Sequence, residues 1–169
     1  MIGAIEAVLA ALNEAGVRYL VVGGVAVVLH GHLRTTADLD LIVELSHDNA
    51  RSAMRALGAL GYRPHAPVPI EDFADRQRRE AWIRDEGLTV FGLWSERFPG
   101  LEVDVFVAEP FAFDEAYRRA LRVELDTTSA TVVSLEDLVA LKLAAGRPLD
   151  LADVQALRAL SLGRDPDAC

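Results

Sequence analysis

The sequence predicts an α+β or mixed α/β core that is followed by C-terminal helices. Three observations predict it: apolar residues at helical spacing open the chain, short apolar runs bounded by glycine and proline follow, and a helix-capping motif precedes the last apolar segments. A chain of 169 residues is long enough to bury its own hydrophobic core. We therefore expect a single domain, with residues 1–133 as the core and residues 134–169 as a helical segment packed on it.

The first half of the chain is predicted to alternate helices and strands. Apolar residues recur at helical spacing over residues 2–15, and Gly16 ends that pattern. Ser46 is expected to cap a helix that Gly61 ends, because a serine at this position accepts a hydrogen bond from a free amide of the first turn. The elements after Gly16 are, in chain order, a strand over 18–22, a helix over 25–30, a strand over 39–45 and a helix over 48–60.

The second half begins with a break at residues 63–70, which contain three prolines and are expected to form a connection. A charge-rich stretch comes next, at residues 71–86. The residues Ser134-Leu135-Glu136-Asp137 resemble a capping box, which opens a helix that runs to Ala145. The remaining elements are strands over 88–93 and 101–107, a helix over 111–121, an extended pair over 123–133 and a final helix over 149–160, before an end at 163–169 that we expect to be frayed.

Composition excludes several classes of protein. The formal net charge of −9 argues against an extended nucleic-acid surface, because such binding depends on neutralising phosphates. Cys169 is the only cysteine, so no disulfide can form within the chain. No apolar stretch reaches the roughly 20 residues that span a membrane, and no secretory signal is visible. These features predict a cytoplasmic protein without a membrane partner.

Three aspartates interrupt apolar strands and are the strongest candidates for chemistry. Asp38 and Asp40 are two residues apart, so their side chains share one face of a strand, and Asp104 lies within a later apolar strand. Buried carboxylates are costly unless they are paired or bind a metal. Two magnesium ions, which prefer oxygen ligands and bridge phosphates, would suit three such groups. Asp104 could in addition accept a proton from an attacking hydroxyl.

The alternative is structural: each aspartate could cap a turn or pair with an arginine. The sequence does not decide whether Glu102, which shares a strand face with Asp104, belongs to the same site.

Gly23 and Gly24 follow the first predicted strand and are candidates for binding a nucleotide. Glycines allow the backbone to approach a phosphate closely and to offer its amides. Arg34 and Thr36, just before the aspartate pair, could contact phosphates, or could lie in a solvated loop with Thr35. The glycine pair alone is equally compatible with an ordinary turn.

Lys142 lies in an otherwise apolar helix, with Arg147, Asp150 and Asp153 close behind it. It could be an inward-facing phosphate ligand, or a surface lysine paired with one of these aspartates. We include Lys142 and Asp150 among the nucleotide-binding candidates and leave Asp153 undecided. His30 and His32 could be metal ligands, but no third ligand lies nearby, so we expect polar residues at a helix end. Arg76, Arg78, Arg79 and Arg84 could contact a polyanionic acceptor, but we expect them to form a solvated helix face.

These residues resemble the minimal nucleotidyltransferases of the DNA polymerase β superfamily. The pattern of that superfamily is a glycine pair, then Asp-apolar-Asp, then a third aspartate on a later strand. Here Val22-Gly23-Gly24, Asp38-Leu39-Asp40-Leu41 and Asp104 match it. The resemblance implies an α+β nucleotidyltransferase fold with a mixed sheet flanked by helices. It also implies transfer of a nucleoside monophosphate from an NTP to a hydroxyl, with Asp38, Asp40 and Asp104 as metal ligands for two magnesium ions, which manganese could replace.

Within the superfamily, residues 142–153 resemble the AbiEii-type branch, whose members often act as toxins held in check by an antitoxin. This resemblance implies a toxin-like enzyme that modifies RNA or protein, with an antitoxin protein as a partner. One departure is Gly24, which stands where many relatives have a serine that contacts phosphate. Two alternatives remain: transfer to a small molecule, as in antibiotic-modifying relatives, and a catalytically silent fold that binds a nucleotide or a partner.

Overall fold

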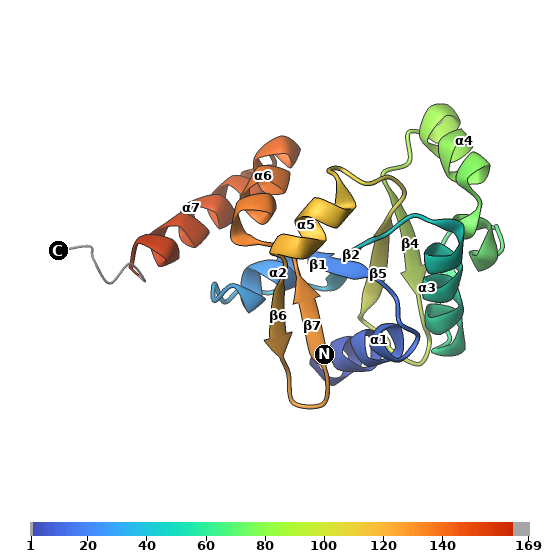
Figure 1. Cartoon of the computed structure of the whole chain (residues 1–169), viewed down its shortest axis with the longest axis horizontal. Coiled ribbons are helices and arrows are strands. Elements are labelled where there is room, and N and C mark those ends of the chain that lie inside the picture. The colour runs from blue at the N-terminus through green and yellow to red at the C-terminus, as the bar shows by residue number, and fades with distance from the viewer. Residues whose placement is uncertain (1, 164–169) are drawn as a thin grey trace.

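The computed structural model describes residues 2–163 as one seven-stranded sheet with helices on both faces (Figure 1). Met1 and residues 164–169, which include Cys169 and most of the predicted frayed end, lie outside the described part. The strands are β1 (Tyr19–Val22), β2 (Asp38–Val43), β3 (Arg63–Pro64), β4 (Val90–Trp94), β5 (Glu102–Phe106), β6 (Leu121–Glu124) and β7 (Ser129–Val132). The helices are α1 (Ile2–Glu14), α2 (Gly23–Leu29), α3 (His47–Ala59), α4 (Arg76–Glu86), α5 (Phe113–Arg119), α6 (Leu135–Ala145) and α7 (Pro148–Leu162), with a short 3₁₀ helix, η1 (Ile70–Ala74).

The sheet is mixed, with strand order β3-β4-β5-β2-β1-β7-β6. The β2–β5 and β1–β7 pairs are parallel, and the other neighbours are antiparallel. This topology places β2 and β5 at the centre, although 58 residues separate the end of β2 from the start of β5. The α+β fold with a mixed, helix-flanked sheet is thereby confirmed.

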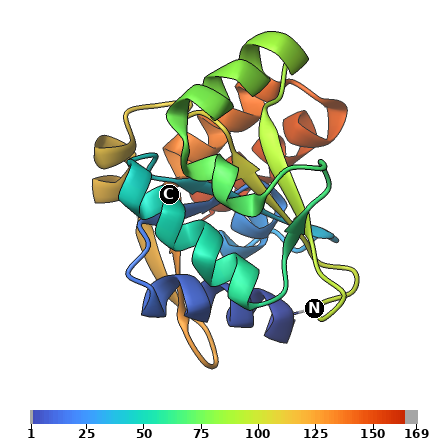
Figure 2. The ribbon, with the colours of Figure 1, turned by 90° about the vertical axis from the view of Figure 1, so that its right-hand side faces the viewer.

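Side chains alternate between the two faces of the central strands. On one face, Leu39, Leu41, Val103 and Val105 are fully buried in the hydrophobic core. Helix α3 packs against β2 on this side, and the Phe91 ring stacks against Trp82 of α4. The polar residues of β2 and β5 must therefore face the opposite side, where α2 contacts both β2 and α6. Figure 2, seen from the side of α3 and α4, shows α6 and α7 lying behind them.

Side-chain caps fix the starts of three helices. Ser46 accepts a hydrogen bond from the Asn49 amide at the start of α3. Ser134 does the same for the Asp137 amide at the start of α6, as the capping box predicts. Asp75, which the sequence pattern did not single out, accepts from the amides of Gln77 and Arg78 and so starts α4. Each such cap contributes about 1 kcal/mol.

The structure differs from the predicted elements in two places. Helix α2 begins at Gly23 rather than at residue 25, so the glycine pair forms its first turn. The proline-rich connection contains strand β3, which pairs with β4 at the edge of the sheet. Pro64 is tolerated there because an edge strand leaves some amides unpaired.

The predicted solvated arginine face is correct for three of its four members. Arg76, Arg78 and Arg84 are exposed and form ion pairs with Glu80, Asp72 and Asp85, respectively. Arg79 was misplaced by that prediction: it is buried, and its guanidinium donates hydrogen bonds to the carbonyls of Phe73 and Leu45. It therefore ties α4 to its neighbours.

Candidate active site

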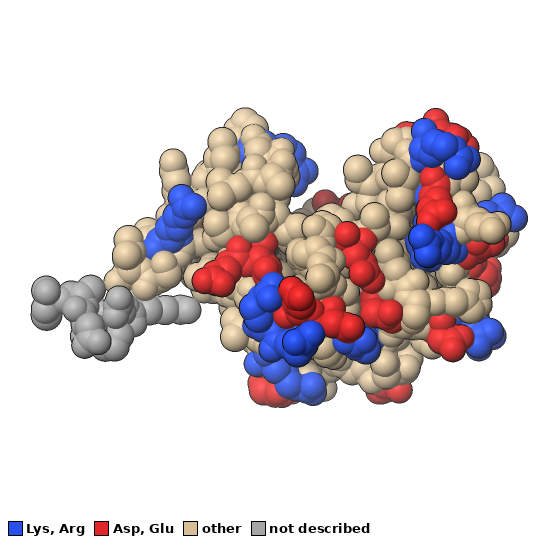
Figure 3. All heavy atoms as spheres, turned by 45° about the horizontal axis from the view of Figure 1, so that its top comes forward, with Lys and Arg blue, Asp and Glu red and all other residues tan. Residues whose placement is uncertain are grey.

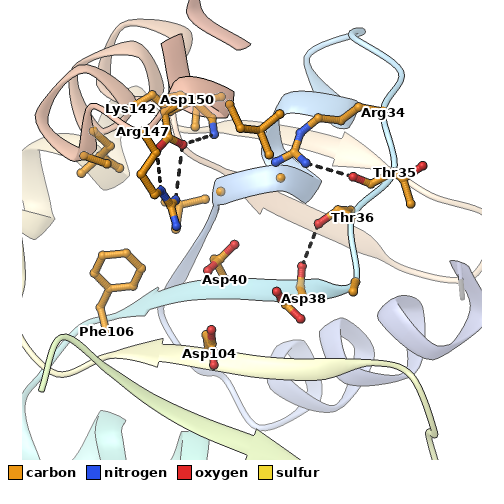
Figure 4. Close-up of a pocket in the computed structure, with 18 residues that line it drawn as sticks. Arg34, Thr35, Thr36, Asp38, Asp40, Asp104, Phe106, Lys142, Arg147 and Asp150 are labelled. Atoms are coloured by element: carbon orange, nitrogen blue, oxygen red, sulfur yellow. Dashed lines mark hydrogen bonds and ion pairs between the residues drawn. The ribbon is translucent and has the colours of Figure 1, made fainter. Parts of the chain in front are cut away.

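The parallel register of β2 and β5 brings the three aspartates together. Asp40 lies directly beside Asp104, and Asp38 lies beside Glu102. All four side chains therefore point to the same face of the sheet. Figure 4 shows Asp38, Asp40 and Asp104 on one side of a pocket, with Lys142, Arg147 and Asp150 on the other.

This pocket has a volume of about 400 Å³. Every predicted nucleotide-binding and metal-binding residue contributes to its wall: Gly23, Gly24, Arg34, Thr36, Asp38, Asp40, Asp104, Lys142 and Asp150. Thr35 also lines it, whereas Glu102 and Asp153 do not. Residues far apart in the sequence thus form one site.

Electrostatic strain is concentrated at Asp40. Burial, followed by the charges of Asp104 and Asp38, raises the pKa of Asp40 to about 6. A hydrogen bond from the Gly24 backbone and the charge of Lys142 act weakly in the other direction. Burial also raises the pKa of Asp104, with further contributions from Asp38 and Glu102. Carboxylates with raised pKa values in a pocket are typical of a functional site that awaits a cation.

Gly23 is required for the close approach of α2 to β2. Its φ of 63° lies in the left-handed region, which disfavours other residues. A Cβ at this position would also overlap the Asp40 carboxylate. The glycine therefore lets Asp40 reach the first turn of α2.

Gly24 provides room for the loop that precedes β2. A Cβ on Gly24 would lie 2.5 Å from Thr36 Oγ1 and 2.6 Å from Arg34 Nη2. Thr36 is further held by donating a hydrogen bond, 3.3 Å long, to the Asp38 carbonyl (Figure 4). A threonine hydroxyl and a guanidinium thus occupy the space where a serine side chain would begin. Because residue 24 is glycine, the serine hydroxyl that many relatives have at this position is absent, and the Thr36 hydroxyl occupies this part of the pocket instead.

Lys142, the only lysine of the chain, is buried rather than on the surface. Its Nζ lies 3.1 Å from Asp150 Oδ1 and 2.7 Å from Asp153 Oδ2, and both aspartates are also buried. The sequence was compatible with an inward-facing lysine or with a surface lysine paired to an aspartate. In the structure Lys142 faces inward and is also paired with aspartates. Asp150 therefore holds cations in place, and its carboxylate already has partners within the protein.

Two arginines extend this group. Arg147 donates to Asp150 from Nε at 2.6 Å, and its side chain is 77% exposed toward the pocket opening. Arg34 Nε lies 3.3 Å from Asp153 Oδ1, which connects the loop before β2 to α7. Burial alone would raise the pKa of Asp150, but its bonds to Arg147 and Lys142 outweigh that effect and lower it. Three cations and one carboxylate, Asp150, thus line the pocket beside the aspartate triad, and Asp153 holds Lys142 and Arg34 from behind the pocket wall.

The donor set is compatible with magnesium bound together with a phosphate ligand. Among residues 2–163, no three acidic, histidine or cysteine side chains converge closely enough to form a preformed metal cage. Magnesium usually binds through one or two carboxylates and completes its shell with water and substrate phosphates. Asp38, Asp40 and Asp104 offer oxygen ligands only, and burial together with the charges of Asp104 and Asp38 raises the pKa of Asp40, so a cation bound beside these carboxylates would favour their charged forms.

Apolar side chains form the remainder of the pocket wall, and the sequence analysis did not single them out. They are Ala37, Phe106, Leu138, Leu141, Ala145 and Leu149, beside Val22 of the glycine motif. Phe106 shares the strand face of Asp104, two residues further along β5, so period-two spacing could have identified it. Leu138, Leu141 and Ala145 lie on the face of α6 that carries Lys142, which helical spacing could likewise have indicated.

The two histidines near the glycine turn have no position in this pocket. His30 caps the C-terminal end of α2, and its Nε2 lies 2.9 Å from the Val133 carbonyl. His32 is half-buried beyond that helix end. The structural interpretation of His30 is confirmed.

Solved structures with similar folds are nucleotidyltransferases of low sequence identity. ANT(2'')-Ia, in complex with adenylyl-2''-tobramycin, is 16% identical with a TM-score of 0.61, covering 95% of this chain and 88% of that chain. The lincosamide antibiotic adenylyltransferase LnuA, with lincomycin bound, is 14% identical with a TM-score of 0.62, covering 94% and 96%. A nucleotidyltransferase from Thermotoga maritima is 15% identical with a TM-score of 0.55, covering 95% and 92%. At such identities the likeness establishes the fold.

Within residues 2–163, no helix has the length and apolar character needed to cross a membrane.

Sequence comparison establishes the family. No curated protein matches the chain. The AbiEii-type branch stays a prediction. Residues 4–161 match the family described as "Nucleotidyltransferase of unknown function (DUF6036)", so the chain belongs to this nucleotidyltransferase family.

Proposed function

We propose that this protein is a magnesium-dependent enzyme that transfers a nucleoside monophosphate from an NTP to a hydroxyl group. One observation carries the proposal: Asp38, Asp40 and Asp104 meet on one sheet face, across a pocket from Lys142 and Arg147. Carboxylates that hold magnesium and cations that hold phosphate are the two components that nucleotidyl transfer needs.

The two sides of the pocket suggest how an NTP would bind. The triphosphate would lie between the aspartates and the cationic side, within reach of Arg34, Thr36 and Arg147. The apolar wall that includes Phe106 would receive the nucleoside, since bases stack well on aromatic rings. The backbone of Gly23 and Gly24 would contact the phosphates.

The proposed reaction is an in-line displacement at the α-phosphorus. The acceptor oxygen forms a bond to that phosphorus, the bond to the β-phosphate bridging oxygen breaks, and pyrophosphate leaves. Asp104 would accept the proton of the acceptor hydroxyl. Asp38, Asp40 and Asp104 would hold two magnesium ions, for which manganese could substitute, and bound magnesium neutralises the charge of the phosphates and polarises them.

Transfer of α-phosphate label tests this proposal. Each of the four NTPs, labelled at the α-phosphate, would be incubated with the protein, magnesium and a cell lysate, beside an Asp38→Ala/Asp40→Ala control. Label transferred only by the intact protein is expected. No transfer with any NTP, with magnesium or manganese, would favour the silent fold that binds nucleotide without turnover.

A toxin-like role is a second candidate, which rests only on analogy with the AbiEii-type branch that residues 142–153 resemble. In that case RNA or protein is the acceptor, and an antitoxin protein is the partner. Induced expression should then arrest growth, and the Asp40→Asn variant should not. Since NTPs are supplied inside the cell, either role places the protein in the cytoplasm.

A further inference from the structure

Beyond Asp104, the functional face of the sheet continues across β4 to the residue that follows β3. Gly92 of β4 is the register partner of Asp104. The His65 amide donates a 3.0 Å hydrogen bond to the Gly92 carbonyl, so His65 is the next position in the same row. The row therefore runs from Asp40 through Asp104 and Gly92 to His65.

Because Gly92 has no side chain, the Asp104 carboxylate and the His65 ring can approach each other over β4. A Cβ on Gly92 would lie 3.2 Å from Asp104 Oδ1 and 3.2 Å from His65 Cδ2. The carboxylate and the imidazole thus flank one point above the strand. This point is beside the group that would accept the acceptor proton.

His65 is oriented by a second carboxylate on this face. Its Nε2 lies 3.2 Å from Glu102 Oε2, and the two side chains are 50% and 52% exposed. Glu102 is in register with Asp38, so carboxylates border the space above Gly92 on more than one side. Both partners of the His65–Glu102 pair remain accessible to a ligand.

The charges around this space favour a cationic ligand over a polyanionic one. Nucleic acids are bound mainly by lysine and arginine. The only lysine is buried, and the exposed arginines of α4 already have carboxylate partners. Figure 3 shows basic and acidic side chains interspersed on the face that it draws. Arg63 lies beyond Trp94 in the neighbouring row. The charged or titratable groups around Asp104 are therefore its register partner Asp40, together with Asp38, Glu102 and His65.

We propose that Gly92, His65 and Glu102 form the acceptor subsite, and that the acceptor is a small molecule with a hydroxyl and a positively charged amine. The inference rests on the proposed nucleotidyl transfer. The acceptor would lie across Gly92, with its amine against Glu102 and its hydroxyl between His65 and Asp104. His65 hydrogen-bonds that hydroxyl, and Asp104 takes its proton as the oxygen bonds to the α-phosphorus and pyrophosphate leaves.

Fractionation of the label-transfer reaction tests the acceptor class. Labelled products are separated into RNA, protein and small molecules, and mass spectrometry of the small-molecule fraction shows whether the acceptor carries an amine. Label in an amine-bearing small molecule is expected. Label mainly in RNA or protein, or in an acceptor without an amine, would overturn the inference and leave the proposed transfer intact. No transfer to any fraction would refute the proposed function itself, and with it this subsite.

Variants test the residues. His65→Ala and Glu102→Gln should each raise the KM for the acceptor about tenfold, because each removes a charge-assisted hydrogen bond to the acceptor. The KM for the NTP should not change.

Glu124→Gln is the matched control. Glu124 is also an exposed strand glutamate beside a basic group, 3.5 Å from Arg122, but it lies on β6 at the other edge of the sheet. Its kinetics should equal those of wild type. If His65→Ala or Glu102→Gln changed the KM for the NTP as strongly as the acceptor KM, these residues would be structural and the subsite would be refuted.

Discussion

Asp40 of β2 and Asp104 of β5 are register partners, and among residues 2–163 neither carboxylate forms an ion pair with a basic side chain. Two partly buried, adjacent carboxylates repel each other when both are charged. This repulsion and burial raise the pKa of both groups, that of Asp40 to about 6. The metal-free protein therefore carries a cost at neutral pH that a bound cation would remove.

The pH dependence of stability should show this cost. The folded pKa of Asp40, about 6, is above its value near 3.9 in the unfolded chain, so the folded state holds this proton more tightly. The free energy of unfolding should then decrease as pH rises from about 4 to 6, by at most about 3 kcal/mol from Asp40. Asp40→Asn should be more stable than wild type at pH 8 and similar to it at pH 4, by urea denaturation. Parallel pH profiles would contradict this assignment.

Removal of Lys142 should destabilise the protein strongly. In Lys142→Met the buried carboxylates of Asp150 and Asp153 lose their shared cation, and breaking a buried pair typically costs about 3–5 kcal/mol. Arg147→Gln is the comparison, since an exposed arginine contributes about 1 kcal/mol or less. Denaturant titrations should separate the two variants, and the Arg147 variant should fold but bind ATP less tightly. Equal stability losses would contradict the account.

The close approach of Gly24 and Thr36 leads us to expect that a change at Thr36 partly restores the activity that is lost when Gly24 is replaced by serine. Gly24→Ser brings a Cβ within 2.5 Å of Thr36 Oγ1, so we expect transfer to fall by about tenfold or more as the loop before β2 shifts. Gly24→Ser/Thr36→Ala removes the obstructing hydroxyl and supplies another nearby, and should recover part of that loss. Transfer kinetics with magnesium-ATP measure both. Additive losses in the double variant would refute the exchange of hydroxyls.

Phe106→Ala separates the nucleoside part of the pocket from its phosphate part. Base stacking on an aromatic side chain contributes about 1–3 kcal/mol, so ATP affinity should fall about tenfold. Affinity for inorganic tripolyphosphate, which has no base, should remain unchanged. Calorimetric titration of both ligands with magnesium checks this. Equal weakening for both ligands would show that Phe106 supports the phosphate side instead.

Local pattern in the sequence predicts the site residues that lie on regular elements. Period-two spacing predicts that Asp38 and Asp40 share one face of a strand. The conformational freedom of glycine predicts a turn at Gly23. Neither prediction requires knowledge of contacts between distant segments. The parallel pairing of β2 with β5 could be expected only through the family resemblance, since nothing local in the sequence states which strands are neighbours. The partners of Lys142 were foreseen for the same reason as the aspartate pair: Asp150 and Asp153 are close to it in sequence.

Features that depend on tertiary packing could not be predicted. The burial of Arg79 follows from hydrogen bonds to the Phe73 and Leu45 carbonyls, and Leu45 is 34 residues away. The contact of Arg34 with Asp153 joins two segments that the sequence separates by more than a hundred residues. The short β3 strand was missed because Pro64 within it, and two further prolines just after it, argue against a strand, and Pro64 is tolerated only because β3 lies at the edge of the sheet.

The most direct test of the central claim compares ATP labelled at the α-phosphate with ATP labelled at the γ-phosphate, in magnesium and lysate, for wild type and Asp104→Asn. The account predicts transfer of α-label alone by wild type, release of γ-label as pyrophosphate, and loss of both in Asp104→Asn with ATP binding retained. Transfer of γ-label, or full activity without the Asp104 carboxylate, would contradict it.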